Sequence, residues 1–366
     1  GCDLKEILTD LEREELVVRC SGGAVATERY RFAHDRIQQA AYSRIPDHDR
    51  GVWHLRIGEI LLKNVPEDRE IKSESRRILF AAVDHLNRAQ DTLEDGDKKC
   101  HLARLNLRAG KAAMRSSAFV PAASYLREGI KMLYTSLWST EQYDLSLRLH
   151  TALVEAEYCN GNFVDVEQTF KLIVEKARSF KDKLRAYSAY IKALGAQGNI
   201  PLAIETGFYV LAQLGEPFPQ KVGKKAIFSD LIRTKMKLRG KSDEALSRLP
   251  EMQNKTKIAA MKILCSMFSL VYIALPQFVP LVSFRMVRLS LRYGLCKESS
   301  FGFAAFASVL GGVLGDHHGA YRFGQLGLRF LERFRAKEWH AHVHTLVYVC
   351  INVWVEPCQC TLEPLL

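Results

Sequence analysis

The stretch that decides the fold runs from residue 145 to residue 177 and reads LSLRLHTALVEAEYCNGNFVDVEQTFKLIVEKA. Its apolar residues recur at the three- and four-residue spacing of one helix face, at Leu145, Leu149, Leu153, Val166, Phe170 and Ile173. Gly161-Asn162 separates the two runs. Glycine supplies the left-handed backbone that ends a helix, and asparagine can cap the next one. The stretch therefore predicts two amphipathic helices joined by a tight turn.

The same turn recurs along the chain. Gly198-Asn199 follows Gly161-Asn162 by 37 residues, close to the period of about 34 residues of tetratricopeptide repeats. Small and bulky residues at the packing positions of such a repeat occur at Gly110, Ala122, Leu126, Gly129, Gly315, Asp316, Gly319, Ala320, Gly324 and Leu328. A helix pair alone cannot bury its apolar face, so pairs must stack. We expect a mainly α fold, an α-α superhelix of the tetratricopeptide-like solenoid kind.

Length and composition fit this expectation. The chain has 366 residues, of which 48% are hydrophobic and 25% charged, an ordinary globular composition too long for one compact core. Nine cysteines are scattered without a Cys-x-x-Cys pair. An odd number at irregular spacing suits a reducing compartment, which predicts a cytoplasmic protein.

The N-terminal residues follow a different pattern. A helical stripe at Leu4, Ile7 and Leu8 precedes a β-prone run at 16–20, a break at Ser21-Gly22-Gly23 and a second run at 28–32. Helical spacing then resumes until Pro46. Helix, hairpin and helix predict a small winged-helix-like unit. The first helix is acidic, which disfavours nucleic acid as a partner.

After Pro46 the strong segments are helical. Trp53, Ile57, Ile60 and Leu61 keep helical spacing and predict an amphipathic helix.

One segment concentrates the positive charge of the chain, whose formal net charge is +11. Residues 221–241 hold eight Lys or Arg residues and one acid, Asp230. Such a segment can meet an acidic partner, a phosphate or an anionic membrane face, or it can be a solvated helix face. The partner-binding candidates in it are Lys224, Lys225, Lys235, Lys237 and Arg239.

An uncharged run of 22 residues extends from Ile263 to Phe284. Its length could span a bilayer, but Pro276 and Pro280 interrupt it. Two short buried helices that meet at a proline-marked turn explain the run equally well. A membrane partner is therefore not expected.

Several motifs together resemble a known family. The run from Phe32 to Ser43, FAHDRIQQAAYS, is similar to the winged-helix end of a STAND/AAA-type ATPase module in large multi-domain signalling kinases. Further similarities to the tetratricopeptide-like helical region that follows this module are His54-Leu55-Arg56-Ile57-Gly58, Asp84-His85-Leu86, Leu249-Pro250, Met252, Tyr293-Gly294 and Leu314-Gly315-Asp316.

The resemblance implies a division of the chain and a place in a larger protein. Residues 1–48 would end the ATPase module, residues 49–215 and 256–366 would form helical repeats, and residues 216–255 would be a basic linker or helix. ATP would bind in a core upstream of Gly1, and sensor or output domains would follow Leu366. His34, Asp35, Arg36, Gln38, Gln39 and Tyr42 become candidates for contact with that core, with Asp35 the expected N-cap of its helix.

Other motifs give little reason to expect chemistry. Gly240-Lys241-Ser242 has only the end of a phosphate-binding loop, and no predicted strand precedes it. His340, His342 and His344 are spaced so that at most two share a helix face, which makes a metal site improbable. We expect no catalytic residue, no metal and no cofactor in this chain.

These observations favour a non-catalytic regulatory scaffold that binds a protein partner or a neighbouring domain through a helical-repeat surface. Two alternatives stay open. The chain could be part of a signalling kinase or ATPase whose histidine or serine/threonine kinase activity resides elsewhere, or part of a STAND-type transcriptional regulator.

Overall fold

The computed structural model describes residues 3–20, 29–66, 73–133 and 137–362. These residues are mainly helical, as predicted, with one two-stranded antiparallel sheet near the N-terminus. The chain divides into two compact units. The first holds residues 1–116 and 127–136, and the second holds residues 117–126 and 137–366.

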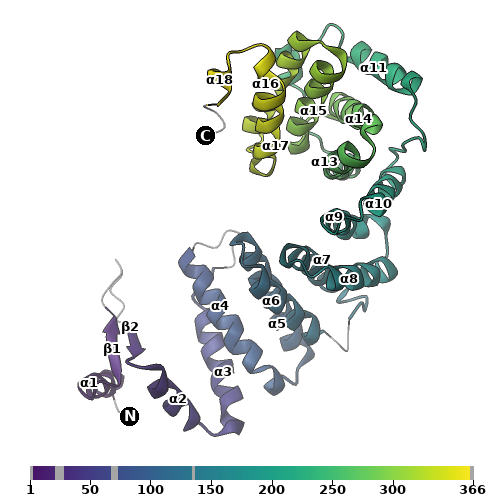
Figure 1. Ribbon diagram of the computed structural model, residues 1–366. Coiled ribbons are helices and arrows are strands. Elements are labelled where there is room, and N and C mark those ends of the chain that lie inside the picture. Colours follow the sequence, from purple (N-terminus) through teal and green to yellow (C-terminus); the bar gives the residue numbers. More distant parts are fainter. Residues whose placement is uncertain (1–2, 21–28, 67–72, 134–136, 363–366) are drawn as a thin grey trace. The chain divides into compact units, whose positions relative to one another are not determined.

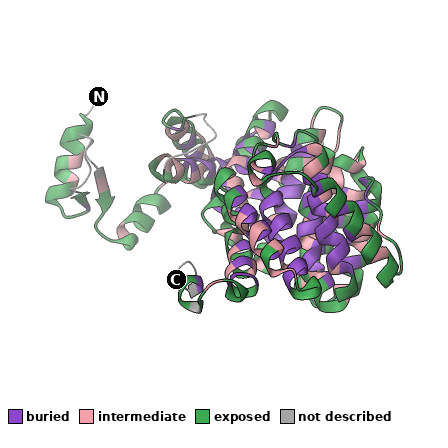
Figure 2. Cartoon of the chain, turned by 90° about the horizontal axis from the view of Figure 1, so that it is seen from above, coloured by how far each residue is buried: buried purple, intermediate pink, exposed green. Residues whose placement is uncertain are grey.

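The first unit opens with a helix, a hairpin and a helix, in the predicted order. They are α1 (Leu4–Arg13), β1 (Val17–Cys20), β2 (Arg29–Phe32) and α2 (Asp35–Ser43). The strands pair antiparallel, with Val17 opposite Phe32 and Cys20 opposite Arg29. The break predicted at Ser21-Gly22-Gly23 lies outside the described residues. Among the described residues before Pro46, Val17 alone is buried, so these elements contribute little core (Figure 2).

The rest of the first unit is built on a helix pair. It contains α3 (Asp47–Leu62), α4 (Ser73–Arg88), the short η1 (Gln90–Thr92) and α5 (Gly96–Arg115). The predicted apolar stripe of α3 does not face the core, because Trp53 is 52% exposed and Ile60 is 51% exposed. The buried residues of α3 are His54 and Gly58. A Cβ atom on Gly58 would lie 2.6 Å from Leu86 Cγ, so close approach at this glycine decides which face of α3 meets α4.

The second unit begins with helical hairpins. Helix α6 (Phe119–Met132) contributes residues to both units, and α7 (Tyr143–Asn160), α8 (Phe163–Lys176), α9 (Phe180–Ala196) and α10 (Ile200–Gln213) follow. Consecutive helices from α7 to α10 pack on one another (Figure 1). Gly161 and Gly198 have φ values of 75° and 78°, the predicted left-handed turns. Capping by Asn162 is not observed, because its side chain instead donates to Glu157 Oε2 at 2.7 Å.

The apolar run at 263–284 forms parts of two helices. Helix α11 (Lys224–Leu238) and α12 (Asp243–Ser247) precede α13 (Lys255–Ala274), η2 (Pro276–Phe278) and α14 (Val279–Tyr293). The break falls at Pro276, as expected. By length and composition α13 could cross a membrane, and it packs against α9, α10, α14 and α15. Its residues Met261, Leu264 and Met267 are fully buried in this core.

The C-terminal helices share one apolar core with the rest of the second unit, from Val154 to Ile351. Helices α15 (Lys297–Leu314) and α16 (His317–Arg333) are followed by η3 (Lys337–Trp339), α17 (His340–His344), the short π-helix η4 (Thr345–Val349), η5 (Asn352–Trp354) and α18 (Cys358–Leu362). Phe303 and Phe330 are fully buried edge to face, 5.0 Å between ring centroids. Helices α15 and α16 approach each other closely at Gly327, where a Cβ atom would lie 3.0 Å from Ser300 O, whereas a Cβ atom on Gly324 would meet Val347 and Ile351 at 3.5 Å.

Candidate functional site

Helix α11 carries most of the basic segment and has two apolar faces. Leu231, Thr234 and Leu238 are buried, and the helix packs on α14. A second stripe, at i, i+4 and i+8, faces solvent: Phe228 is 63% exposed, Ile232 is 41% exposed and Met236 is 62% exposed. A helix that exposes an apolar stripe in addition to its buried face usually marks an interaction site.

This exposed stripe borders a hollow that we name the apolar recess. The recess has a volume of about 590 Å³ between α11 and the α15–α16 pair. Its apolar lining consists of Phe228, Leu231, Ile232, Met236, Leu238, Phe306, Leu310 and Phe323. Phe306 is fully buried and stacks edge to face on Phe323, with centroids 5.0 Å apart, so one wall is anchored in the core of the second unit.

The lining of the apolar recess is positively charged. The lining has four cationic side chains and one carboxylate, Asp316, so its net charge is +3. The cations are Lys235, Arg239, Lys241 and Arg322. Lys235 Nζ lies 3.8 Å from Asp316 Oδ2. Arg322 is held by a 2.6 Å contact from Nε to Asp243 Oδ1. Because Lys235 and Arg239 are exposed, their charges remain available to an incoming group.

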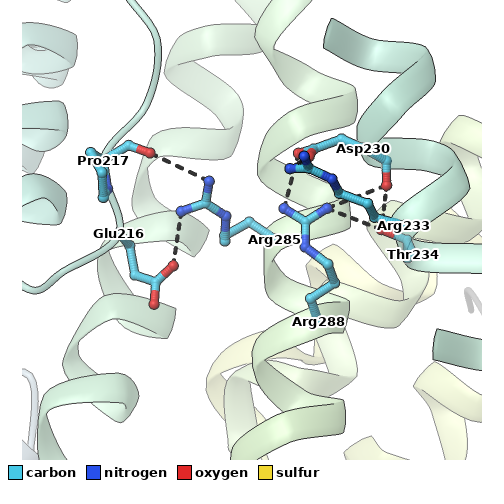
Figure 3. Close-up of polar contacts among 7 residues, drawn as sticks. All are labelled: Glu216, Pro217, Asp230, Arg233, Thr234, Arg285 and Arg288. Carbon is cyan, nitrogen blue, oxygen red and sulfur yellow. Dashed lines mark hydrogen bonds and ion pairs between the residues drawn. The ribbon is translucent and has the colours of Figure 1, made fainter. Parts of the chain in front are cut away.

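A second hollow, the arginine cleft, lies on the other side of α11. It has a volume of about 430 Å³ and is lined by Glu216, Asp230, Arg233, Met236, Lys237, Arg285, Arg288, Leu289, Arg292 and Tyr293. Figure 3 shows Arg285 and Arg288 reaching from α14 to different partners. Arg288 meets Asp230 Oδ2 on α11 at 2.9 Å, and Arg285 meets Glu216 Oε2 at 2.8 Å.

A buried charge network fixes one end of the arginine cleft. Glu216 accepts from Lys257 Nζ at 2.7 Å through Oε1 and from Arg285 through Oε2. The three side chains are only 12–19% exposed. Lys257 also donates to Leu214 O at 3.0 Å. The loop between α10 and α11 is thereby tied to α13 and α14.

The structure distributes the predicted basic residues over different surfaces. Lys224 and Lys225 are exposed at the start of α11 and line neither hollow. Lys235 and Arg239 line the apolar recess, whereas Lys237 lines the arginine cleft. Sequence reasoning missed Arg285, Arg288 and Arg292, although their i, i+3, i+7 spacing places them on one helix face.

Comparison with known proteins finds a similarity to a signalling protein. The hybrid signal transduction histidine kinase G of Dictyostelium discoideum is 22% identical to this chain in an alignment 358 residues long, and the alignment covers 87% of this chain. The chain is weakly homologous to part of a signalling protein. It spans 10% of the length of that kinase. No protein-family model matches the chain.

The predicted interdomain residues lie on or next to α2. His34, Asp35, Arg36, Gln38 and Gln39 are exposed. The prediction of Asp35 as N-cap is wrong by one residue, because His34 holds that position and its Nδ1 accepts from Arg36 N at 3.1 Å. Imidazole reaches the backbone amide here because His34 has the extended backbone of a cap.

The remaining sequence motifs have ordinary structural roles. Ser242 caps α12 by accepting from Ala245 N, so Gly240-Lys241-Ser242 links two helices. His340 and His344 stack on each other, with ring centroids 3.9 Å apart. Within the described ranges, no group of three or more His, Cys, Asp or Glu side chains could hold a metal ion.

A polar chain links three helices of the first unit. Tyr42 of α2 meets His54 Nε2 at 3.0 Å, and His54 Nδ1 lies 2.7 Å from His85 Nδ1 on α4. Burial lowers the pKa of both imidazoles, and the charge of Arg88 lowers both further, while Asp84 opposes this effect at His85. A proton on both facing Nδ1 atoms would break their hydrogen bond.

We therefore expect the pairing of α3 with α4 to weaken in acid. In the unfolded chain each histidine has a pKa of about 6.5. Folding lowers the pKa of both, so the stabilisation is fully present above the unfolded pKa and is lost as the pH falls below it. Amide hydrogen exchange over α3 and α4, corrected for intrinsic rates, should accelerate between pH 7.5 and pH 5. His85→Asn should flatten this dependence and the same change at the exposed His101 should not; equal profiles for the two variants would contradict the assignment.

Proposed function

We propose that this chain is a non-catalytic regulatory part of a longer signalling protein and that it binds a protein partner, or a neighbouring domain of the same protein, at the apolar recess. The observation that carries the proposal is the exposed stripe of Phe228, Ile232 and Met236 beside a hollow with a cationic lining. Exposed apolar side chains lose contact with water only when a partner covers them.

The chemistry of the recess favours a protein segment as its occupant. Apolar side chains on the partner would enter between Phe228 and Phe323, and acidic side chains beside them would meet Lys235 and Arg239. Nucleic acid offers phosphates but few aliphatic groups for such a lining. We propose that the protein acts in the cytoplasm, because an odd number of irregularly spaced cysteines suits a reducing compartment.

We extend the proposal to the architecture of the parent protein. The consecutive packing of α7 to α10 supports stacking into a tetratricopeptide-like superhelix. The order helix, hairpin, helix at the N-terminus supports a winged-helix end of a STAND/AAA-type ATPase module. ATP and the kinase chemistry would then belong to parts of the protein outside this chain.

A charge-introducing variant tests the binding role in the longer protein. Phe228→Glu combined with Ile232→Glu places carboxylates on the exposed stripe, where surface changes disturb stability little. Coupling between regulatory sites is typically worth 5- to 150-fold, so we expect signal-dependent phosphoryl transfer to change by about fivefold or more. Val164→Glu, at a 70% exposed apolar position on α8, is the matched control. A response equal to that of the control would refute the role of the recess.

The similarity to the Dictyostelium histidine kinase favours one second candidate, a part of a histidine kinase that itself takes part in ATP chemistry. An ATP-turnover assay on the 366-residue chain separates the two. We expect no turnover above background, and a saturable ATPase rate would favour the second candidate.

A further inference from the structure

The arginine cleft has more positive charge than its own carboxylates balance. Five cationic side chains line it, Arg233, Lys237, Arg285, Arg288 and Arg292, against the two carboxylates Glu216 and Asp230, a net charge of +3. The cations come from two helices, α11 and α14, which pack on each other. The excess is therefore a property of the folded unit and not of one solvated helix face.

The two carboxylates hold the deeper arginines in place. Arg285 and Arg288 are 19% and 13% exposed, and each has its own carboxylate within 2.9 Å. Arg288 also donates to Thr234 Oγ1 at 3.1 Å and to Asp230 O at 3.3 Å. A planar guanidinium fixed by several acceptors keeps its remaining N–H groups in a set direction, which lowers the entropy lost when an anion binds.

The outer cations lack such compensation. Among the described residues, Arg233 pairs only with the carboxylate that Arg288 already uses, with Nη1 3.9 Å from Asp230 Oδ1. Arg292 lies over the Tyr293 ring at 5.1 Å. Lys237 and Arg292 have no carboxylate within ion-pair distance in the described part of the chain. These three side chains are exposed and can turn toward a ligand.

The guanidinium groups also repel one another. Burial lowers the pKa of Arg288, and the nearby charges of Arg285 and Arg233 lower it further, against the stabilising effect of Asp230. A bound anion would reduce this repulsion and would gain from charge-assisted hydrogen bonds in a partly desolvated place.

We propose that the arginine cleft is a binding site for a phosphate monoester or another compact phosphate with two or more negative charges. Arg233, Lys237 and Arg292 would contact the phosphate oxygens, and Leu289 and Tyr293 would border the group that carries the phosphate. The volume of about 430 Å³ admits a phosphate together with a small attached group. The phosphate can come from a phosphorylated side chain or from a free phosphorylated compound.

Titration calorimetry on the 366-residue chain at physiological salt tests the site. The probes are inorganic pyrophosphate and the blocked tripeptide acetyl-Ala-phosphoserine-Ala-amide, each compared with sulfate at equal ionic strength. We expect saturable one-to-one binding, and about tenfold weaker binding in Arg233→Gln and in Arg292→Gln, since a charge-assisted hydrogen bond is lost in each. Lys224→Gln, the same charge change on α11 outside the cleft, should bind like the wild type.

Each result bears on the proposal. Tighter binding of the tripeptide assigns the site to a phosphorylated side chain, and tighter binding of pyrophosphate assigns it to a free compound. Absence of saturable binding to either probe, or equal losses in Arg233→Gln, Arg292→Gln and Lys224→Gln, would overturn it. Phe228→Glu with Ile232→Glu should leave phosphate binding intact, so the arginine cleft and the apolar recess can fail independently.

Discussion

Gly294→Ala is expected to destabilise the second unit by about 4 kcal/mol, the largest loss we foresee for a single methyl group. Gly294 has φ 99° and ψ 178°, a backbone region that side chains other than glycine avoid. A Cβ atom there would lie 2.4 Å from Pro250 O. That oxygen accepts from Leu295 N at 2.8 Å, and Met252 N donates to Leu295 O at 2.7 Å, so the methyl group would break a short parallel bridge.

Urea unfolding followed by circular dichroism measures this loss. The control is Gly312→Ala in the exposed part of α15, where nothing beyond the neighbouring backbone of the helix itself lies within 4 Å of the added Cβ. Alanine favours a helix over glycine by up to about 1 kcal/mol, so the control should unfold at the same or a higher urea concentration. Equal midpoints for the two variants would show that Gly294 is not strained as described.

Glu216→Ala is expected to cost about 3 kcal/mol, because it leaves two partly buried cations without their carboxylate. Lys257 would keep Leu214 O and Arg285 would keep Pro217 O, at 3.0 Å and 3.3 Å, but neither acceptor carries a charge. The loop that Glu216 ties to α13 and α14 should loosen at the same time.

Glu167→Ala provides the matched comparison. Glu167 pairs with Lys171 at 2.6 Å, but the two side chains are 48% and 69% exposed, so water screens this pair and its loss should cost much less than the loss of Glu216. The free energies of unfolding from urea titration decide between the two expectations. If the two substitutions lower the free energy of unfolding equally, the burial of the Glu216 network adds nothing to the stability of the second unit.

The sequence predicted the positions of the helices and turns better than it predicted which face of each helix is buried. Gly161 and Gly198 could be placed because a left-handed turn after a periodic apolar run is a local signal. The buried face of α3 could not be predicted, because the contact at Gly58 depends on where the fold places Leu86 of α4. Gly294 looked like part of a repeat motif, and only the folded chain brings Pro250 to it.

The candidate site could be predicted only in part, because it too depends on contacts between residues far apart in the sequence. The charge of α11 is visible in the sequence, whereas its division between two hollows depends on the positions of α14, α15 and α16. Arg322 is 79 residues from the Asp243 that holds it, and Arg285 is 69 residues from Glu216. Such pairs carry no signal in a single sequence, because any of many acids and bases could meet.

Photo-crosslinking from position 228 tests the central claim most directly. A photoreactive phenylalanine analogue replaces Phe228 in the complete signalling protein, and a second sample carries it at the exposed Val164. We expect crosslinks from position 228 to converge on one segment with apolar and acidic side chains, in the same protein or in its purified partner, and to vanish when Ile232→Glu is added. Crosslinks from position 228 as scattered and as sparse as those from position 164 would contradict the claim that α11 presents a docking surface.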